Sequence, residues 1–393
     1  MLIIIILLYT LINFYILSKM IKWINNFIFK YKKLCIYFIS VIYILLYLTP
    51  IFGYFLPISS LQKGIQLAAN CFMGVLLHIC IITFLYSLFR FFYIKVFKKD
   101  NAFFSSKKYL IGSAIFTILI ISFLSIYGIV HVKNIYVNKY DITIEDKKTN
   151  LDSLKIVLLA DLHLGYNIGS DVIHNMVDKI NNEKADLVII AGDIFDNSTE
   201  TVDDVDKIIS YLKNIKSKYG VYATFGNHDV EEKLFAGFKT SFKKKYKRSN
   251  KMEEILKDAN IIILDDDVKE FNDFYLIGRK DYKRPGDGTK NREDISTLLN
   301  NLDTRMPIIV IDHEPRDLKE LSNYPIDLYL SGHTHNGQFF PLTLVTNIIW
   351  SNPYGYKKYN NLNSVVTSGI GVYGPNMRIG SNSEIVVINV SFK

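Results

Sequence analysis

Cysteine is scarce in this chain of 393 residues: there are three, at positions 35, 71 and 80, and none in residues 133–393. Small domains held together by disulfides are rich in cysteine, so that class of fold is excluded. Disorder is excluded as well, because hydrophobic residues make up 49% of the sequence.

Acidic residues are almost missing from the N-terminal third. Residues 1–132 contain one, Asp100, against twelve Lys or Arg, which gives a net charge of +11. The rest of the chain carries a net charge of −3, and the two parts give the total of +8. The C-terminal part therefore lacks the broad positive field that nucleic-acid binding requires, and nucleic acid is not an expected partner.

The same N-terminal third contains four apolar stretches, each about the length that crosses a bilayer, which takes roughly 20 helical residues. They lie near residues 2–18, 34–57, 65–89 and 110–132. The first has no basic region before it and no small-residue cleavage site after it, so we interpret it as a retained anchor. Pro50 and Gly53 are expected to kink the second stretch without dividing it. Residues 1–132 are thus predicted to form a multi-pass transmembrane domain of four helices.

Basic residues in the loops between these stretches predict the orientation. The first loop holds five lysines and the third loop six basic residues, whereas the second loop has only Lys63. Loops rich in Lys and Arg remain on the cytoplasmic side, so the first and third loops are expected there. With four spans, both chain ends then lie outside, and residues 133–393 form an extracytoplasmic domain.

Residues 133–393 alternate short apolar runs with helical patterns, which indicates a layered α/β domain. Strands are expected at 134–144, 155–160, 186–191, 221–225, 261–264, 274–277, 308–311, 328–330, 364–367 and 384–390, and helices at about 171–181 and 202–215. A domain of this kind places its ligand site outside the carboxyl ends of its strands.

Polar residues able to bind metal ions occur just where the apolar runs end. Five runs are followed by such residues: Asp161 and His163, Asp193, Asn227 and His228 with Asp229, His313, and His333 with His335. Because strand ends meet at one edge of a sheet, we expect these side chains to converge. By contrast, His174 lies inside a helical pattern without a partner motif and is interpreted as structural.

The chemistry of this set favours hydrolysis. Imidazoles, carboxylates and an amide carbonyl suit borderline divalent ions such as manganese, iron or zinc. The set is too large for one ion but suits two ions that share a carboxylate. Two ions about 3.5–4 Å apart can clamp a phosphoryl group and convert water to hydroxide near neutral pH. We find no Ser or Cys motif typical of a covalent nucleophile, so metal-bound hydroxide, with manganese as the first choice of ion, is the predicted nucleophile.

The chain resembles the calcineurin-like metallophosphoesterase superfamily in five motifs, which follow the family's order: Asp161-Leu162-His163, Gly192-Asp193, Gly226-Asn227-His228-Asp229, His313, and Gly332-His333-Thr334-His335. The resemblance covers about residues 150–393. It implies a four-layer α/β sandwich, in which two β-sheets are flanked by helices.

The same resemblance implies a role for each matching residue. A first metal ion would be bound by Asp161, His163 and His335, and a second by Asn227, His313 and His333. Asp193 would bridge the two ions. His228 would protonate the leaving oxygen instead of binding metal, and Asp229 would orient it.

A closer likeness involves the stretch from Gly332 to Gln338 with Pro341, and a second stretch from Thr367 to Gly371 that continues through Arg378, Gly380 and Glu384. These resemble the membrane-associated bacterial branch of the superfamily, which includes UDP-2,3-diacylglucosamine pyrophosphatases. That branch usually has Gly where this chain has Asn336, and Asn also tolerates a left-handed backbone. The resemblance implies the lipid bilayer and a phosphorylated, lipid-like substrate as partners.

One segment directly after the Asn-His motif combines aromatic and basic residues. Leu234, Phe235, Phe238, Phe242 and Tyr246 recur at helical spacing, with Lys239, Lys243, Lys244, Lys245, Lys247 and Arg248 between them. A basic helix with an aromatic face is typical of a membrane interface. A solvated helix that covers the domain with its aromatic side is the alternative.

The leading hypothesis is a membrane-anchored dimetal phosphoesterase that hydrolyses a phosphoester or pyrophosphate bond of a lipid-linked substrate. Two alternatives are a phosphodiesterase for soluble nucleotides and a UDP-2,3-diacylglucosamine pyrophosphatase of lipid A synthesis. The non-enzyme alternative is a membrane receptor or scaffold that has kept the fold. Such a protein is expected to have lost ligands, and none is missing from the sequence. The sequence leaves the oligomeric state open.

Overall fold

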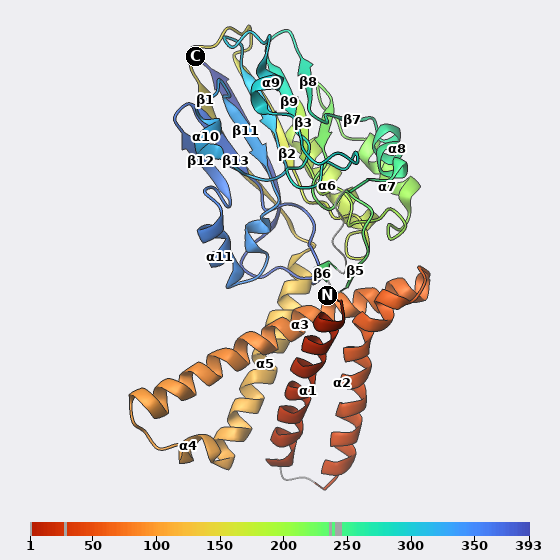
Figure 1. Cartoon of the computed structure of the whole chain (residues 1–393), viewed down its shortest axis with the longest axis vertical. Coiled ribbons are helices and arrows are strands. Elements are labelled where there is room, and N and C mark those ends of the chain that lie inside the picture. The colour runs from red at the N-terminus through yellow and green to blue at the C-terminus, as the bar shows by residue number, and fades with distance from the viewer. Residues whose placement is uncertain (1, 27–29, 236–237, 240–245) are drawn as a thin grey trace. The chain divides into compact units, whose positions relative to one another are not determined.

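Four long apolar helices come first in the chain (Figure 1). The computed structural model describes residues 2–26, 30–235, 238–239 and 246–393. The helices are α1 (Leu2–Asn26), α2 (Lys32–Phe55), α3 (Ser60–Phe91), continued by a π-helical turn over Phe92–Val96, and α5 (Lys107–His131); α4 (Ala102–Ser105) is a single turn. Among the described residues, α1, α2, α3 with its continuation, and α5 are the four helices long and apolar enough to cross a membrane. The four predicted spans are therefore confirmed as helices.

Local sequence explains where these helices begin and end. Ser59 caps α3, because its side chain accepts a hydrogen bond from the backbone N–H of Gln62 at 3.2 Å. Pro50 lies inside α2, which stays one helix over its whole length, as expected. Helix α1 continues past the predicted apolar stretch to Asn26, since lysines such as Lys19 and Lys22 are good helix formers.

The chain divides into two compact units. The first consists of residues 1–130 with the segments 234–242 and 374–377, and the second consists of 131–233, 243–373 and 378–393. The sequence did not anticipate that two short segments of the C-terminal part would group with the membrane-spanning helices. In the first unit Phe235 is buried, and its ring centroid lies 5.7 Å from that of Tyr54 and 6.2 Å from that of Tyr9.

The predicted basic helix after the Asn-His motif is wrong where the structure describes it. β5 (Leu234–Phe235) and β6 (Phe238–Lys239) are antiparallel strands, with Phe235 opposite Phe238. The sequence between them is Ala-Gly, and Gly costs a helix about 1 kcal/mol relative to Ala. Residues 240–245 of the predicted helix lie outside the described residues. Arg248 is buried and pairs with Asp265 at 2.8 Å, so it is not part of a solvent-exposed basic face.

The second unit is built on two six-stranded sheets. In the first, the strand order is β1 (Ile135–Ile144), β14 (Ser383–Phe392), β2 (Ser153–Leu159), β3 (Leu187–Ala191), β4 (Val221–Thr224) and β7 (Ile261–Ile263). In the second, it is β12 (Gly355–Tyr359), β13 (Leu362–Val366), β11 (Leu328–Ser331), β10 (Ile308–Ile311), β9 (Tyr275–Gly278) and β8 (Asp267–Glu270). β2, β3 and β4 run parallel, and so do β9, β10 and β11. Each predicted strand has a counterpart, whereas β8 and β12, which are largely exposed and charged, were not predicted.

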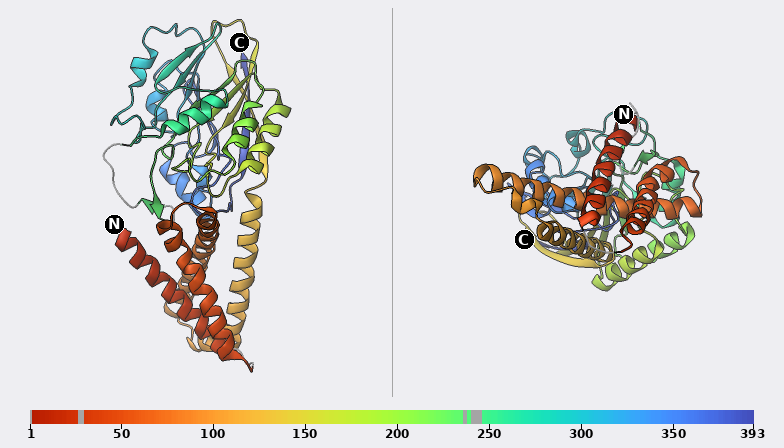
Figure 2. Two further views of the ribbon diagram at one scale, coloured as in Figure 1. Left: turned by 90° about the vertical axis from the view of Figure 1, so that its right-hand side faces the viewer. Right: turned by 90° about the horizontal axis from the view of Figure 1, so that it is seen from below.

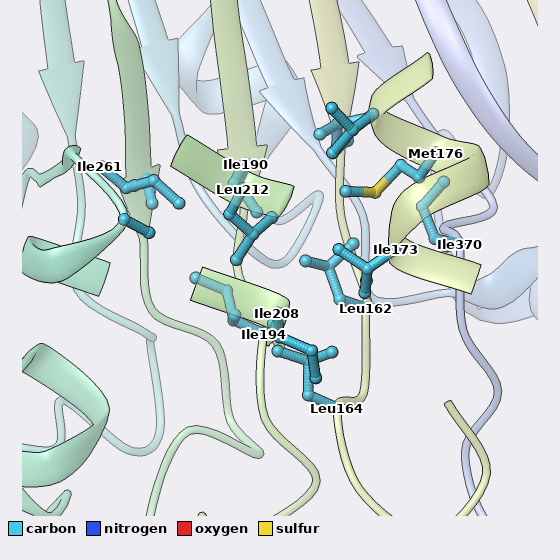
Figure 3. Close-up of a cluster of buried hydrophobic side chains, with 14 of the residues drawn as sticks. Leu162, Leu164, Ile173, Met176, Ile190, Ile194, Ile208, Leu212, Ile261 and Ile370 are labelled. Atoms are coloured by element: carbon cyan, nitrogen blue, oxygen red, sulfur yellow. The ribbon is translucent and has the colours of Figure 1, made fainter. Parts of the chain in front are cut away.

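Helices cover the outer faces of both sheets. α6 (Ser170–Glu183), α7 (Val205–Lys213) and α8 (Asn250–Asp258) pack on the first sheet, and α9 (Ile295–Leu299) and α10 (Leu318–Leu321) pack on the second. Figure 2 shows α6 and α7 on one side of the sheets and α9 on the other. Figure 3 shows the core under α6 and α7, to which Ile173 and Met176 of α6, Ile208 and Leu212 of α7, and Ile190 of β3 contribute.

Alternating side chains of the strands hold these layers together. In β2, Val157 and Leu159 face the helices, whereas Ile156 and Leu158 face the second sheet and contribute to a core that includes Ile309. All are buried, and burying each such side chain contributes about 1.5–3 kcal/mol. Because their side chains are buried on both faces of the sheet, these strands appear in the sequence as continuous apolar runs. The predicted four-layer α/β sandwich is confirmed.

Candidate metal centre

The predicted ligands come from the ends of neighbouring strands in both sheets. Asp161 and His163 follow β2, Asp193 follows β3 and Asn227 follows β4, all in the first sheet; His313 follows β10, and His333 and His335 follow β11, in the second. Five of these seven have left-handed backbone, with φ between 47° and 70°: Asp161, His163, Asp193, His333 and His335. Such backbone costs about 1–3 kcal/mol per residue and is concentrated at functional sites.

Two glycines, Gly192 and Gly226, allow the ligand side chains to approach the backbone closely, because a Cβ atom at either position would collide with a ligand. A Cβ atom on Gly192 would lie 2.5 Å from Nδ1 of His313, and one on Gly226 would lie 2.3 Å from Oδ1 of Asp193. Gly192 also has a φ of 81°. The glycines of the two motifs therefore allow backbone and ligand side chains to approach closely.

The first ligand group is formed by Asp161, His163 and His335, which are all buried. The Nε2 atoms of His163 and His335 lie 3.1 Å apart, and Oδ1 of Asp161 lies 3.6 Å from Nε2 of His335. Two nitrogen ligands about 2.1 Å from one metal ion lie roughly 3 Å apart. The spacing therefore fits a shared ion between the two imidazoles.

The second group is formed by Asp193, His313 and His333. Nδ1 of His333 lies 3.1 Å from Nε2 of His313. The opposite ring nitrogen of His313 donates to the backbone carbonyl of Ala191 at 2.9 Å, which directs its Nε2 toward the site. Oδ1 of Asn227 is buried without a hydrogen-bond partner, as expected for an oxygen that a cation would satisfy.

Asp193, a member of the second group, also faces the first group. Its Oδ2 atom is 3.1 Å from Nε2 of His313 and 3.8 Å from Nε2 of His163. One carboxylate thus faces an imidazole of each group. The donor set and its spacing fit two divalent ions with Asp193 shared between them.

The electrostatics of the site are set by burial and by these neighbours. Burial raises the pKa of Asp161 to about 6. Burial also opposes charge on Asp193 and His313, but their mutual attraction outweighs it, so the pKa of Asp193 falls well below its usual range and that of His313 rises well above it. Burial lowers the pKa of His333 and His335 well below the usual value, so both are neutral near pH 7 and have a nitrogen lone pair to offer.

Comparison with known proteins agrees with this geometry. Residues 154–337 match the family model described as calcineurin-like phosphoesterase. The chain is similar to an uncharacterized metallophosphoesterase of Campylobacter jejuni, with 29% identity over 70% of this chain and 69% of the relative. It is also similar to an uncharacterized metallophosphoesterase of Helicobacter pylori, with 29% identity over 60% of each chain. A protein of Danio rerio named transmembrane protein with metallophosphoesterase domain is 31% identical over 70% of this chain and 62% of its own length.

Over residues 154–337, this chain matches a calcineurin-like phosphoesterase domain. The family match and the names of the relatives support a metal-dependent phosphoester hydrolase, and the relative from Danio rerio supports membrane association together with the four apolar helices. The matches span 60% to 69% of the length of these three relatives.

In this phosphoesterase domain, the ring of His228 is held by a residue that sequence reasoning missed. Nδ1 of His228 donates to Oδ1 of Asn197 at 2.5 Å. The carboxylate of Asp229 instead accepts the backbone N–H groups of Phe195 and Gly226, each at 2.7 Å. The sequence predicted that Asp229 orients His228; in the structure Asp229 accepts hydrogen bonds from the loop backbone, and Asn197 accepts one from the ring of His228.

Tyr373 is a second residue that the sequence did not single out. The centroid of its ring lies 4.5 Å from that of His228. The side-chain amide of Gln338 accepts from the backbone N–H of Tyr373 at 3.0 Å and donates to its carbonyl at 3.1 Å. The loop that carries Tyr373 is thereby fixed beside the site by the residue that ends the last motif.

Two arginines complete the surroundings of the second ligand group. Arg284 donates to the backbone carbonyl of Asn227 at 2.9 Å and thus fixes that ligand's main chain. The guanidinium of Arg316 lies 4.9 Å from the ring centroid of Tyr282 and 5.1 Å from that of Trp350, and the Trp350 ring is 5.3 Å from that of His333. A single sequence offers no signal for either arginine, because each is recognised only by what it contacts in space.

Proposed function

We propose that this protein is a membrane-anchored phosphoesterase that uses two divalent metal ions to hydrolyse a phosphoester or pyrophosphate bond of a lipid-linked substrate. The observation that carries the proposal is the pair of facing imidazole nitrogens in each ligand group, 3.1 Å apart, with Asp193 between the groups. When bound, the two ions would lower the pKa of water and stabilise charge on the phosphoryl oxygens.

Seven residues would hold the ions. Asp161, His163 and His335 would bind the first, Asn227, His313 and His333 the second, and Asp193 both. Manganese is the first ion to test, with iron and zinc as alternatives, because imidazole, carboxylate and amide ligands suit all three.

His228 would give a proton to the leaving oxygen. Its ring is half-buried, and Asn197 fixes its orientation through Nδ1, which leaves Nε2 to face the substrate. In the free protein burial lowers the pKa of His228 to about 4, so the ring is neutral near pH 7. An anionic phosphoryl group beside it would raise this pKa, so the proton donor forms when the substrate binds.

Arg316 would bind a further anionic group of the substrate. Its guanidinium lies 5.1 Å from the ring centroid of Trp350, which neighbours His333; it also pairs with the carboxylate of Glu314, and its side chain is 26% exposed. A second phosphate of a pyrophosphate, or the phosphate of a lipid headgroup, has the charge that such a guanidinium recognises.

The charge around the loops supports an extracytoplasmic phosphoesterase domain, since eleven of the twelve basic residues of the N-terminal third lie in residues 19–33 and 90–108, at the α1–α2 and α3–α5 connections and the helix ends beside them. A lipid-linked substrate is supported by the four membrane-spanning helices, which keep the domain close to the bilayer.

The experiment is an assay of the purified full-length protein with manganese against a soluble chromogenic phosphodiester, a phospholipid panel and a UDP-linked lipid. The proposal expects metal-dependent turnover that Asp193→Ala abolishes. Asp178→Ala, which replaces an exposed aspartate on α6, is the matched control and should keep full activity. Turnover that survives Asp193→Ala would contradict the proposal.

A further inference from the structure

The helix α11 (Leu342–Ile349) exposes its apolar side chains, although it belongs to a well-packed domain. It begins five residues after Gly337, which ends the short 3₁₀ turn carrying His335. Its exposed large hydrophobic residues are Leu342 (42%), Leu344 (56%), Val345 (44%), Ile348 (85%) and Ile349 (66%), preceded by Phe340 (58%). A contiguous exposed apolar surface of this kind marks an interaction site.

Other exposed hydrophobic residues of the same domain are scattered. Tyr136, Ile262, Val268, Tyr282 and Tyr356 are exposed singly, on separate elements. Single apolar residues on a surface are ordinary. The side chains of α11 are therefore a distinct feature and not the background of the domain.

The sequence around α11 is free of charge over a long stretch. No Asp, Glu, Lys or Arg occurs in residues 328–356, and no Asp or Glu occurs in residues 328–383. The first charged residues after the helix are Lys357 and Lys358. An uncharged apolar helix followed by lysines matches a lipid surface, which offers apolar chains below and phosphates above.

Two polar residues of α11 donate hydrogen bonds back to the helix itself. The hydroxyl of Thr346 donates to the backbone carbonyl of Thr343 at 2.9 Å, and the side-chain amide of Asn347 donates to the same carbonyl at 2.7 Å. Side chains that bond back to their own helix need fewer partners from water. The helix thus lowers the cost of leaving the aqueous phase.

We infer that α11, together with Phe340, lies in the interface of the bilayer, with lipid as its partner. The four membrane-spanning helices of the same chain keep its domain at a membrane, which makes lipid the apolar partner always present. This inference rests on the surface of α11 and does not depend on the proposed hydrolysis.

The placement has a consequence for the metal centre. α11 lies in sequence between His335, a residue of the first ligand group, and Trp350, whose ring is 5.3 Å from that of His333. A helix in the interface would hold both ligand groups near the depth of lipid headgroups. A phosphate attached to a lipid would then reach the site without leaving the membrane surface.

The test uses tryptophan fluorescence, because the chain has only Trp23 and Trp350. In the full-length protein, Trp23→Phe and Trp350→Phe provide a background, into which Ile348→Trp is introduced. The matched control is Ile262→Trp, which replaces an exposed isoleucine (47%) on β7. Each protein is reconstituted in phosphatidylcholine vesicles that contain lipids brominated near the carbonyl end of the acyl chains.

An interfacial helix lies about 5–10 Å into the headgroup region, so the brominated lipids should quench the Ile348→Trp protein at least about two-fold. The Ile262→Trp protein should be quenched by aqueous iodide instead. Quenching of the Ile348→Trp protein by iodide but not by brominated lipid would overturn the inference. So would protection from both quenchers, which would mean that another protein surface, such as a second copy of this chain, covers α11.

Discussion

Nδ1 of His228 lies 2.5 Å from Oδ1 of Asn197, four residues after Asp193 on the same loop. One loop therefore supplies both the carboxylate that lies between the two ligand groups and the partner that orients the proposed proton donor. Because the amide oxygen can only accept, the Nδ1 proton is fixed, and the tautomer of His228 is set. Movement of this loop would change metal binding and proton donation together.

Asn197→Ala should leave both metal ions bound but slow the chemical step. Loss of the residue that holds a catalytic group typically costs about 10–100-fold in activity. The loss should be larger for substrates with poor leaving groups, because those need the proton that His228 gives. Asn197→Asp keeps an acceptor at this position and should retain most of the rate. Equal losses for good and poor leaving groups would remove Asn197 from this role.

Asp229→Asn should act differently, because the carboxylate of Asp229 accepts two backbone N–H groups. The side-chain amide that replaces the carboxylate directs its NH₂ group at one of these backbone N–H donors. One buried hydrogen bond is therefore lost, at a cost of about 1–3 kcal/mol. We expect a lower unfolding temperature and weaker metal binding, with no dependence of the rate loss on the leaving group. A leaving-group dependence like that of Asn197→Ala would restore Asp229 as the partner of His228.

The strands that deliver the ligands could be predicted from the sequence, because β2, β3, β10 and β11 are buried on both faces and read as short apolar runs between polar turns. The convergence of six of the seven predicted ligands into two groups followed from the same pattern, since parallel strands end at one edge. Exposed strands such as β8 and β12 could not be predicted, because charged residues such as Lys269 and Lys357 interrupt the apolar pattern by which a strand is recognised in a sequence.

The contacts that surround the ligands could not be predicted from the sequence, for a different reason. Asn197, Arg284 and Tyr373 make contacts that bring distant segments together, and no local periodicity encodes such contacts. The left-handed backbone at Asp161 and His163 is likewise imposed by tertiary packing and not by residue type. The aromatic spacing after Asp229 suggested a helix, yet its described part forms β5 and β6.

Asp193→Ala should abolish binding of both ions together. Oδ2 of Asp193 faces His313 at 3.1 Å and His163 at 3.8 Å, so its removal takes a ligand from each site. His335→Ala removes a ligand from the first group alone and should leave one ion per chain. Metal analysis of the purified proteins checks both outcomes. One ion retained at full occupancy in Asp193→Ala would contradict the shared position.

Metal binding should release protons and weaken as the pH falls. The pKa of His313 is held well above its usual value by Asp193, so His313 is protonated in the metal-free protein at neutral pH and must lose that proton to bind through Nε2. Asp161 has a pKa of about 6 and becomes protonated as the pH falls through that value. Manganese titrations by calorimetry in buffers of different ionisation enthalpy should show about one proton released per chain at pH 7.5. Affinity that is unchanged between pH 7.5 and 5.5 would contradict this assignment.

The orientation in the membrane gives the last prediction. Eleven of the twelve Lys and Arg residues of 1–132 lie in residues 19–33 and 90–108, around the α1–α2 and α3–α5 connections, so these connections should stay in the cytoplasm and residues 133–393 should lie outside. A reporter phosphatase that folds only outside the cytoplasm, fused after Lys393, should be active, whereas a fluorescent reporter that folds only inside should be dark. Replacing Lys95, Lys98 and Lys99 by Gln while adding lysines beside Lys63 should weaken this preference, because the difference in positive charge between the loops becomes smaller. If only the cytoplasmic reporter works with the natural sequence, the phosphoesterase domain lies inside, where a nucleotide-linked lipid precursor would normally be met, and a UDP-linked lipid becomes the favoured substrate.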